Sequence, residues 1–227
     1  MDDVQTIYDD LWSTTFPLFQ QGQYEIDPLI NDPEDTRRGL TLRARLNPGI
    51  ILKIEEFTQK LRSVVPDQYF IPASDLHLTV LAVINCQSGV QYDNDRAQSY
   101  IKAVSDCIED LPAPRIEFTG ITASPSCLLL QGYPENDSLE RLRNRLRESF
   151  KTSDLPHSVD ARYRIKTAHV TIMRFQKRQA SLRGFAQFIS AHKNHRIGIE
   201  EIQEVELVAN DWYHKSDITK AIQVFPF

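Results

Sequence analysis

Two histidines stand in the same local pattern at two places in this 227-residue chain. His77 and Thr79 lie in the stretch DLHLTVLAVI, and His169 and Thr171 lie in TAHVTIMRF. In each copy, apolar residues fill the second and fourth positions of the motif. Residues two apart in a strand project from the same face, so each histidine is expected to share a face with its threonine while the apolar residues are buried.

The repetition of this motif favours a functional role. A single histidine in a strand is usually a core residue with a hydrogen-bond partner. The composition predicts only about 0.06 copies of a His-apolar-Thr-apolar motif by chance, yet this chain has two, 92 residues apart. The second copy therefore indicates a repeated half-domain.

Paired histidines suit the cleavage of a phosphodiester. A base must activate water and an acid must protonate the leaving oxygen, and the histidine pKa near 6.5 allows either role at neutral pH. Each threonine hydroxyl can donate to a non-bridging phosphate oxygen, where charge grows in the transition state. No metal or other cofactor is required, and we expect a bell-shaped pH profile with its optimum between about pH 6 and 8. Which histidine is acid and which is base stays open.

Other residues could join this site or build a different one. Tyr163 has the same strand parity as His169 and is expected to line the cleft. A metal site would use Asp75 with the two histidines, but no further ligand has convincing spacing. A serine triad lacks a G-x-S-x-G elbow. Four further aromatic residues can stack on a base, namely Tyr133, Phe70, Trp212 and Tyr213.

Several polar residues are instead expected at the surface. We interpret His192, His195 and His214 as surface residues and His157 as a solvated loop residue. Arginines at positions 141, 143, 145 and 147 are expected on the exposed side of an amphipathic helix.

Composition limits the class of protein. A net charge of −5 argues against non-specific binding of long nucleic acid. The chain has no apolar run of membrane-spanning length, and its start is acidic, so we expect a cytoplasmic protein without membrane contact. Cys86, Cys107 and Cys127 are far apart, which predicts neither disulfides nor a zinc site. We expect a monomer.

Periodicity predicts an α+β chain with largely antiparallel strands. The expected helices are 48–64, 94–111, 136–150 and 180–192. The expected strands are 39–46, 75–84, 115–124, 127–133, 162–175, 200–211 and 221–227, and the SPS turn joins the third and fourth as a hairpin.

The paired HLTV and HVTI resemble the signature of the two-histidine phosphoesterase superfamily. That superfamily includes bacterial RNA 2′,3′-cyclic phosphodiesterases (2′-5′ RNA ligases), plant cyclic phosphodiesterases and a nucleotide-binding domain of a kinase-anchoring protein. The resemblance covers residues 38–227 and implies a bilobal domain. Its two pseudo-symmetric lobes have mainly antiparallel sheets that face a central cleft, with helices outside. Arg174 resembles an arginine that many members carry, and residues 1–37 match nothing and are expected to be an extension or cap.

The sequence therefore predicts a metal-independent phosphodiesterase for a 2′,3′-cyclic phosphate or a 2′,5′-linked nucleotide or RNA end. His77, Thr79, His169 and Thr171 are the predicted catalytic residues, and Arg174 and Tyr163 are predicted to bind substrate. A nucleotide-binding or sensor module without turnover is one alternative. The 2′-5′ RNA ligation that some relatives perform is another.

Overall fold

The fold is α+β, with five α-helices and nine strands in the part of the chain that the structure describes. The structure is a computed structural model that describes residues 4–90, 94–179 and 181–227. The helices are α1 (Val4–Gln20), α2 (Pro48–Arg62), α3 (Ala97–Ile108), α4 (Ser138–Thr152) and α5 (Arg183–Ala191). The strands are β1 (Arg38–Arg45), β2 (Tyr69–Phe70), β3 (His77–Gln87), β4 (Arg115–Ser124), β5 (Cys127–Pro134), β6 (Val170–Arg174), β7 (Arg196–Glu201), β8 (Glu204–Asp211) and β9 (Lys220–Pro226).

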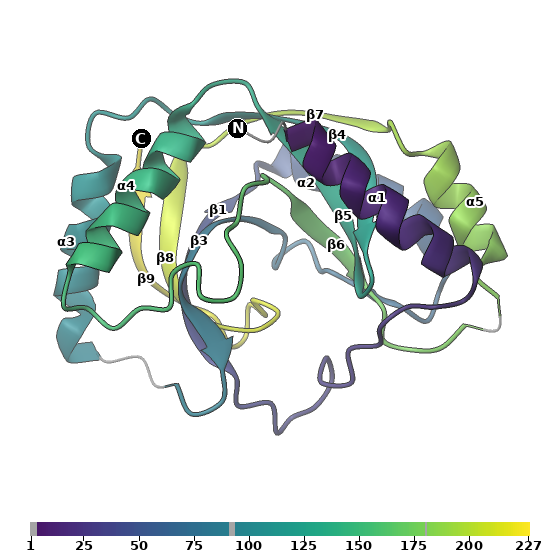
Figure 1. Ribbon diagram of the computed structural model, residues 1–227, viewed down its shortest axis with the longest axis horizontal. Coiled ribbons are helices and arrows are strands. Elements are labelled where there is room, and N and C mark those ends of the chain that lie inside the picture. Colours follow the sequence, from purple (N-terminus) through teal and green to yellow (C-terminus); the bar gives the residue numbers. More distant parts are fainter. Residues whose placement is uncertain (1–3, 91–93, 180) are drawn as a thin grey trace.

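The strands form one antiparallel sheet in the order β7-β4-β5-β6-β3-β1-β8-β9, with β2 paired to β6. The two strands that carry the motifs, β3 and β6, are therefore neighbours at the centre. Leu78 opposite Val170 is the pair recorded between them, whereas β1 and β3 pair along most of their length. Backbone pairing is therefore sparse between β3 and β6, which lie near the middle of the molecule in Figure 1.

Local sequence explains the elements that flank the motifs. In β3, Leu78 and Val80 are fully buried while His77 and Thr79 are partly exposed on the opposite face, as the alternation predicts. The side chain of Asn47 caps α2 by accepting a hydrogen bond from the Ile50 amide, and Pro48 occupies the first turn, where proline is tolerated.

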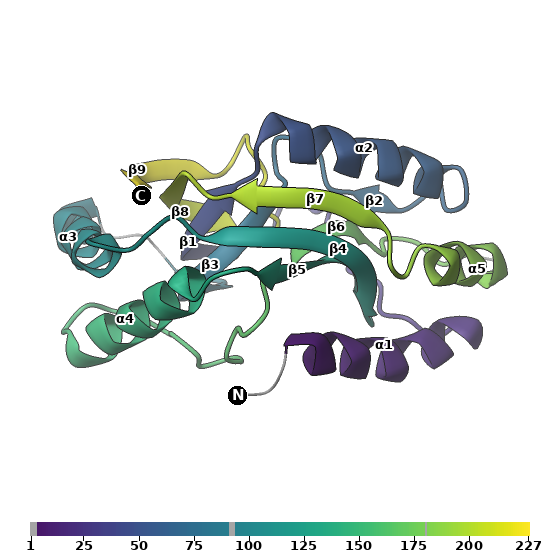
Figure 2. The same ribbon diagram turned by 90° about the horizontal axis from the view of Figure 1, so that it is seen from above.

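Helices cover both sides of the sheet. Figure 2 shows α1 and α2 on opposite sides of the strands, with α3 and α4 together at one end. α1 packs on β4 and α5, α2 packs on β7, α4 packs on β3, and α3 packs on β9. The apolar stripe Leu139, Leu142, Leu146 and Phe150 of α4 is fully buried. Leu78 and Val80 of β3 share one core with the α4 stripe, and His77 and Thr79 lie on the other face of that strand.

The α+β class and the antiparallel pairing are confirmed. The strands belong to one continuous sheet. The predicted arrangement as two lobes with separate sheets is not confirmed and stays a prediction. The predicted helix 180–192 is observed from Arg183, and its residue 180 lies outside the described residues. Two short strands, β2 and β7, are absent from the sequence prediction.

The strand predicted over 162–175 is wrong in its first half. Only Val170–Arg174 is a strand, and residues 162–169 lack regular structure. Side chains of α4 bind this backbone instead of a neighbouring strand. Arg147 donates to the Ile165 carbonyl and Arg143 donates to the Thr167 carbonyl. Such bonds satisfy backbone carbonyls without a sheet ladder.

The N-terminal segment is α1 followed by an irregular arm, residues 21–37, that leads into β1. The amide of Glu25 donates to the Pro125 carbonyl, and the amide of Asp27 donates to the Phe175 carbonyl. The arm therefore lies against the ends of β4 and β6. The division at residue 37 stays a prediction, and residues 1–3 lie outside the described ones. In the described residues, no helix is both long and apolar enough to cross a membrane.

Candidate active site

All six predicted site residues line the same pocket on the open face of the central strands. They are His77, Thr79, Tyr163, His169, Thr171 and Arg174. β3 supplies His77 and Thr79, and β6 supplies Thr171 and Arg174. His169 immediately precedes β6, and Tyr163 lies in the irregular segment 153–169. The cavity volume is about 180 Å³, small beside the roughly 300–1,000 Å³ of typical ligand pockets.

His77 has a fixed orientation. Its Nδ1 lies 2.7 Å from the backbone carbonyl oxygen of Asp75. A carbonyl only accepts, so Nδ1 carries the hydrogen and the lone pair of the neutral ring is on Nε2. The carboxylate of Asp75 is bound elsewhere, because its Oδ1 accepts from the Ser74 hydroxyl and the Ser216 amide. Asp75 therefore orients His77 through its backbone and is not arranged as a metal ligand.

His169 has a different partner. It immediately precedes β6, and its Nδ1 lies 2.7 Å from the hydroxyl oxygen of Thr167, which is buried. A hydroxyl can donate or accept, so this contact serves both the neutral ring and the charged ring. The carbonyl of Thr167 is held in turn by Arg143, 3.0 Å away.

Burial and nearby cations keep both histidines neutral. Burial lowers the pKa of His77 to about 3, with Arg43, Arg45 and His169 adding to the effect against the Asp75 hydrogen bond. Burial lowers the pKa of His169 to about 4, assisted by Arg143 and Arg174. The site is thus a positive environment, in which an anion is favoured and a second proton is not.

Arg143 lies beneath the site rather than on the solvated face that the sequence suggested. Its side chain is 3% exposed and donates to the carbonyls of Thr79 and Val80 in β3 and of Thr167 before β6. The apolar arc of α4 is wide enough to include position 143, so the arginine faces the sheet. Its guanidinium therefore links the two motif segments where the backbone ladder is sparse.

His214 is a third histidine in the pocket, and the expectation that it lies on the surface is wrong. It is 7% exposed, and its ring lies 4.0 Å from that of His77 between centroids. It follows β8 in a tight turn and has a left-handed backbone, with φ of 58°. Its Nδ1 lies 3.5 Å from Arg43 Nη1, and its Nε2 lies 3.1 Å from Asn210 Nδ2.

The aromatic candidates divide into two groups. Tyr163 (62% exposed), Trp212 and Tyr213 line the pocket. Tyr133 and Phe70 do not line it, because Tyr133 bonds to Gln131 and Phe70 is buried beneath Arg62. Arg162 and Arg37 lie over the Trp212 ring, at 4.3 and 4.8 Å from its centroid.

Sequence reasoning missed His214, Arg43 and Asn210 as neighbours of the motifs. Two features of the sequence were signals for them. In the run NDWYH, a tryptophan and a tyrosine follow the end of a predicted strand, where small or polar turn residues are usual. An arginine inside the strand LTLRARL is the other unusual feature. Among the described residues, no three His, Cys, Asp or Glu side chains cluster as metal ligands.

Comparison with known proteins agrees with the fold. A family described as "AKAP7 2'5' RNA ligase-like domain" matches residues 41–219. No curated protein sequence matches the chain.

Solved structures have the same fold at low sequence identity. TT0787 of Thermus thermophilus superposes with a TM-score of 0.62 and 16% identity, covering 83% of this chain and 97% of that one. ATU0111 from Agrobacterium tumefaciens, a conserved protein of unknown function, gives 0.58 and 14%, covering 92% and 95%. LigT of E. coli complexed with ATP gives 0.53 and 14%, covering 84% and 98%.

The residues matched by the family model span most of the sheet and include both histidine motifs. The strands β3 and β6 are neighbours in that sheet, and residues of both motifs line one pocket. The chain therefore belongs to the AKAP7 2′5′ RNA ligase-like family of the two-histidine phosphoesterase superfamily.

Proposed function

We propose that this protein is a phosphodiesterase that hydrolyses a 2′,3′-cyclic phosphate or a 2′,5′-linked nucleotide or RNA end, without a metal. The observation that carries the proposal is the pocket in which His77, Thr79, His169 and Thr171 meet among arginines. Its small volume suits a phosphodiester with part of one nucleoside, not a long duplex.

In this reaction His77 is the general base. Its Nδ1 hydrogen is committed to the Asp75 carbonyl, so Nε2 of the neutral ring has the lone pair that accepts a proton from water. The water oxygen forms a bond to phosphorus while its proton passes to His77. The lowered pKa of His77 keeps this ring neutral and ready for that step.

His169 is the general acid. Its Nδ1 faces the Thr167 hydroxyl, which can donate to the neutral ring and accept from the charged ring, so this site accommodates the proton of an acid. In the charged ring, Nδ1 donates to the Thr167 hydroxyl and Nε2 holds the proton for transfer. As the bond from phosphorus to the ribose oxygen breaks, that oxygen takes the proton from His169. Return of the proton from His77 to His169 through solvent then resets the pair.

The threonines and Arg174 stabilise the charge on phosphate. Thr79 and Thr171 line the pocket beside the histidines and can donate to the non-bridging oxygens. The Nε of Arg174 is buried without a hydrogen bond to any of the described residues, so a phosphate oxygen would satisfy it. Bound phosphate also raises the pKa of both histidines, which favours protonation of the acid.

A nucleotide-binding module without turnover is the second candidate. The lowered pKa values favour it, because the acid is mostly unprotonated at neutral pH in the free protein. Crystal structures of E. coli LigT complexed with ATP, 3′-AMP and NADP+ add that a protein of this fold binds nucleotides. The RNA ligation of relatives would use the same histidines in reverse.

The test is turnover in the presence of a chelator. Protein treated with EDTA is incubated with 2′,3′-cyclic nucleoside monophosphates, 2′,5′-dinucleotides and 3′,5′-dinucleotides, and products are separated by chromatography. Cleavage of one of the first two classes that is abolished by His77→Ala and His169→Ala, but retained by the distant His192→Ala, is the expected result. Nucleotide binding by calorimetry with no cleavage of any substrate would replace the proposal with the second candidate.

A further inference from the structure

His214 covers one face of the His77 imidazole. The two rings lie 4.0 Å apart between centroids with an interplanar angle of 33°, which is direct contact. The Asp75 carbonyl holds the edge of the same ring at Nδ1. His77 is thereby fixed by one hydrogen bond and one stacked ring, leaving Nε2 to the pocket.

The surroundings of His214 hold it as a neutral ring. Both of its nitrogens face N–H donors, of Arg43 on one side and of Asn210 on the other. The neutral imidazole has one lone pair and accepts from one of these donors, whereas a charged imidazole has no lone pair and would accept from neither. Burial lowers its pKa well below the usual value, and His77, Arg43, Arg174 and Arg45 are the charged or titratable neighbours that add to this.

The backbone at His214 is unusual for its residue type. Its φ of 58° lies in the left-handed region, which non-glycine residues adopt rarely and mostly in turns or at functional sites. Such a conformation persists where neighbouring contacts determine it. The carboxylate of Asp75 supplies one of these contacts by accepting from the Ser216 amide, two residues after His214.

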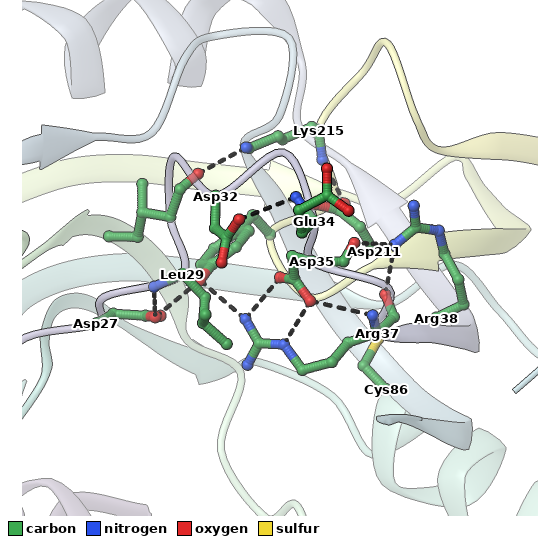
Figure 3. Close-up of polar contacts among 12 residues, drawn as sticks. Asp27, Leu29, Asp32, Glu34, Asp35, Arg37, Arg38, Cys86, Asp211 and Lys215 are labelled. Carbon is green, nitrogen blue, oxygen red and sulfur yellow. Dashed lines mark hydrogen bonds and ion pairs between the residues drawn. The ribbon is translucent and has the colours of Figure 1, made fainter. Parts of the chain in front are cut away.

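The N-terminal arm holds the same turn from outside. The hydroxyl of Tyr213 donates to Asp27 at 2.8 Å and accepts from Arg37 at 2.9 Å. Figure 3 shows Arg37 clasped by the carboxylate of Asp35, with Asp27 to one side and Lys215 above. Lys215 in turn donates to the Ile30 carbonyl. Residues before the family match at 41 therefore fix the turn that carries His214.

We propose that His214 is a positioning residue of this site. Its ring, held by Arg43, Asn210 and the arm through Tyr213, orients His77 and shields it from water. This role rests on the proposed function of His77 as a base. It differs from the role of a catalytic residue because His214 acts on His77, not on the phosphate.

The test replaces His214 by asparagine, which tolerates a left-handed backbone but has no ring to stack. Two quantities are measured: kcat on the cleaved substrate, and the pKa of His77 from the NMR titration of its ring signals. We expect kcat to fall about tenfold, less than the roughly 10²-fold that a misplacement of about 1 Å can cost, with a smaller change in KM. The pKa of His77 should rise toward 6.5 as water reaches the ring. His192→Asn is the matched control, because His192 is also stacked, on Phe188, but lies away from the pocket.

Tyr213→Phe extends the test if His214→Asn does not fold. It removes only the hydroxyl that joins Asp27 and Arg37, and a smaller shift in the same directions is expected. Tyr24→Phe is its control, since Tyr24 is a buried arm tyrosine whose hydroxyl bonds outside the pocket. An unchanged kcat or an unchanged His77 pKa in His214→Asn, or in Tyr213→Phe where that variant alone folds, would overturn the inference. The pKa measurement needs no substrate, so it tests His214 even if no phosphodiester is cleaved.

Discussion

The two copies of the motif share the pattern His-apolar-Thr-apolar but have different supports. His77 is the first residue of β3, bonded to a backbone carbonyl and covered by His214. His169 precedes β6, bonded to the Thr167 hydroxyl and backed by the buried Arg143. The repeat thus brings two equivalent histidines to one pocket, whereas residues that are not repeated make them unequal. A base and an acid require this inequality.

Deleting the histidines is the strongest test of that comparison. His77→Ala and His169→Ala are each expected to lower turnover by about 10² to 10⁴, the scale for loss of a general base or acid. A p-nitrophenyl phosphodiester separates the two roles, because its leaving group needs no protonation. On that substrate His169→Ala should regain most of its activity while His77→Ala should not. Equal recovery of both variants would contradict the assignment.

The pH dependence sharpens the same distinction. In the proposed reaction the active form has His169 charged and His77 neutral, and burial lowers the pKa of both rings. Above the pKa of His169, the charged fraction of that ring falls about tenfold per pH unit. Values of kcat/KM measured from pH 5 to 8 are therefore expected to decline steadily, and the optimum is moved below the range of 6 to 8 that ordinary histidines predict. A plateau between pH 6 and 8 would show that the free histidines are not shifted.

Arg143→Met tests the buried cation that lowers the pKa of His169. Loss of this cation should raise the pKa of His169, so the decline of kcat/KM begins at a higher pH. Three carbonyls also lose their donor, at a cost of about 1–3 kcal/mol each when left unsatisfied, and urea unfolding measures the total. Arg141→Met is the control on the same helix, since Arg141 is exposed. A wild-type pH profile in Arg143→Met would show that Arg143 does not set the pKa of His169.

The smallest expected effect concerns the threonines. Thr79→Val and Thr171→Val retain the side-chain shape and remove one hydroxyl each. In the proposed reaction each hydroxyl would donate one hydrogen bond to a phosphate that arginines would also contact. We therefore expect kcat to fall about tenfold or less, below the loss at an oxyanion donor that acts alone. Unequal losses of kcat in the two variants would show that the threonines, like the histidines, have different roles. Steady-state kinetics on the preferred substrate measures this.

The sequence predicts the parts of this site that depend on local pattern. Alternation in β3 and the hairpin β4–β5 follow from residues near one another, and the repeated motif identifies the two histidines. Periodicity places the start of β6 too early because the backbone carbonyls before it bond to arginines of α4, a contact that periodicity does not contain. His214 reaches His77 from 137 positions away, through a turn whose path depends on the arm and on β8. Non-local contacts of this kind follow from the fold and not from spacing.

The sparse pairing between β3 and β6 also has a dynamic consequence. Leu78 opposite Val170 is the backbone pair between β3 and β6, which divide the sheet into two halves of four strands along its main order. A local opening can therefore separate β3 from β6 without unfolding the strands on either side. Phosphate bound between His77 and His169 would contact both motif segments and make that local opening less favourable. Amide hydrogen exchange at the central strands is then expected to slow on binding of inorganic phosphate, while exchange in the outer strand β9 stays the same. Slower amide exchange in β3 and β6 would therefore report that the pocket is occupied.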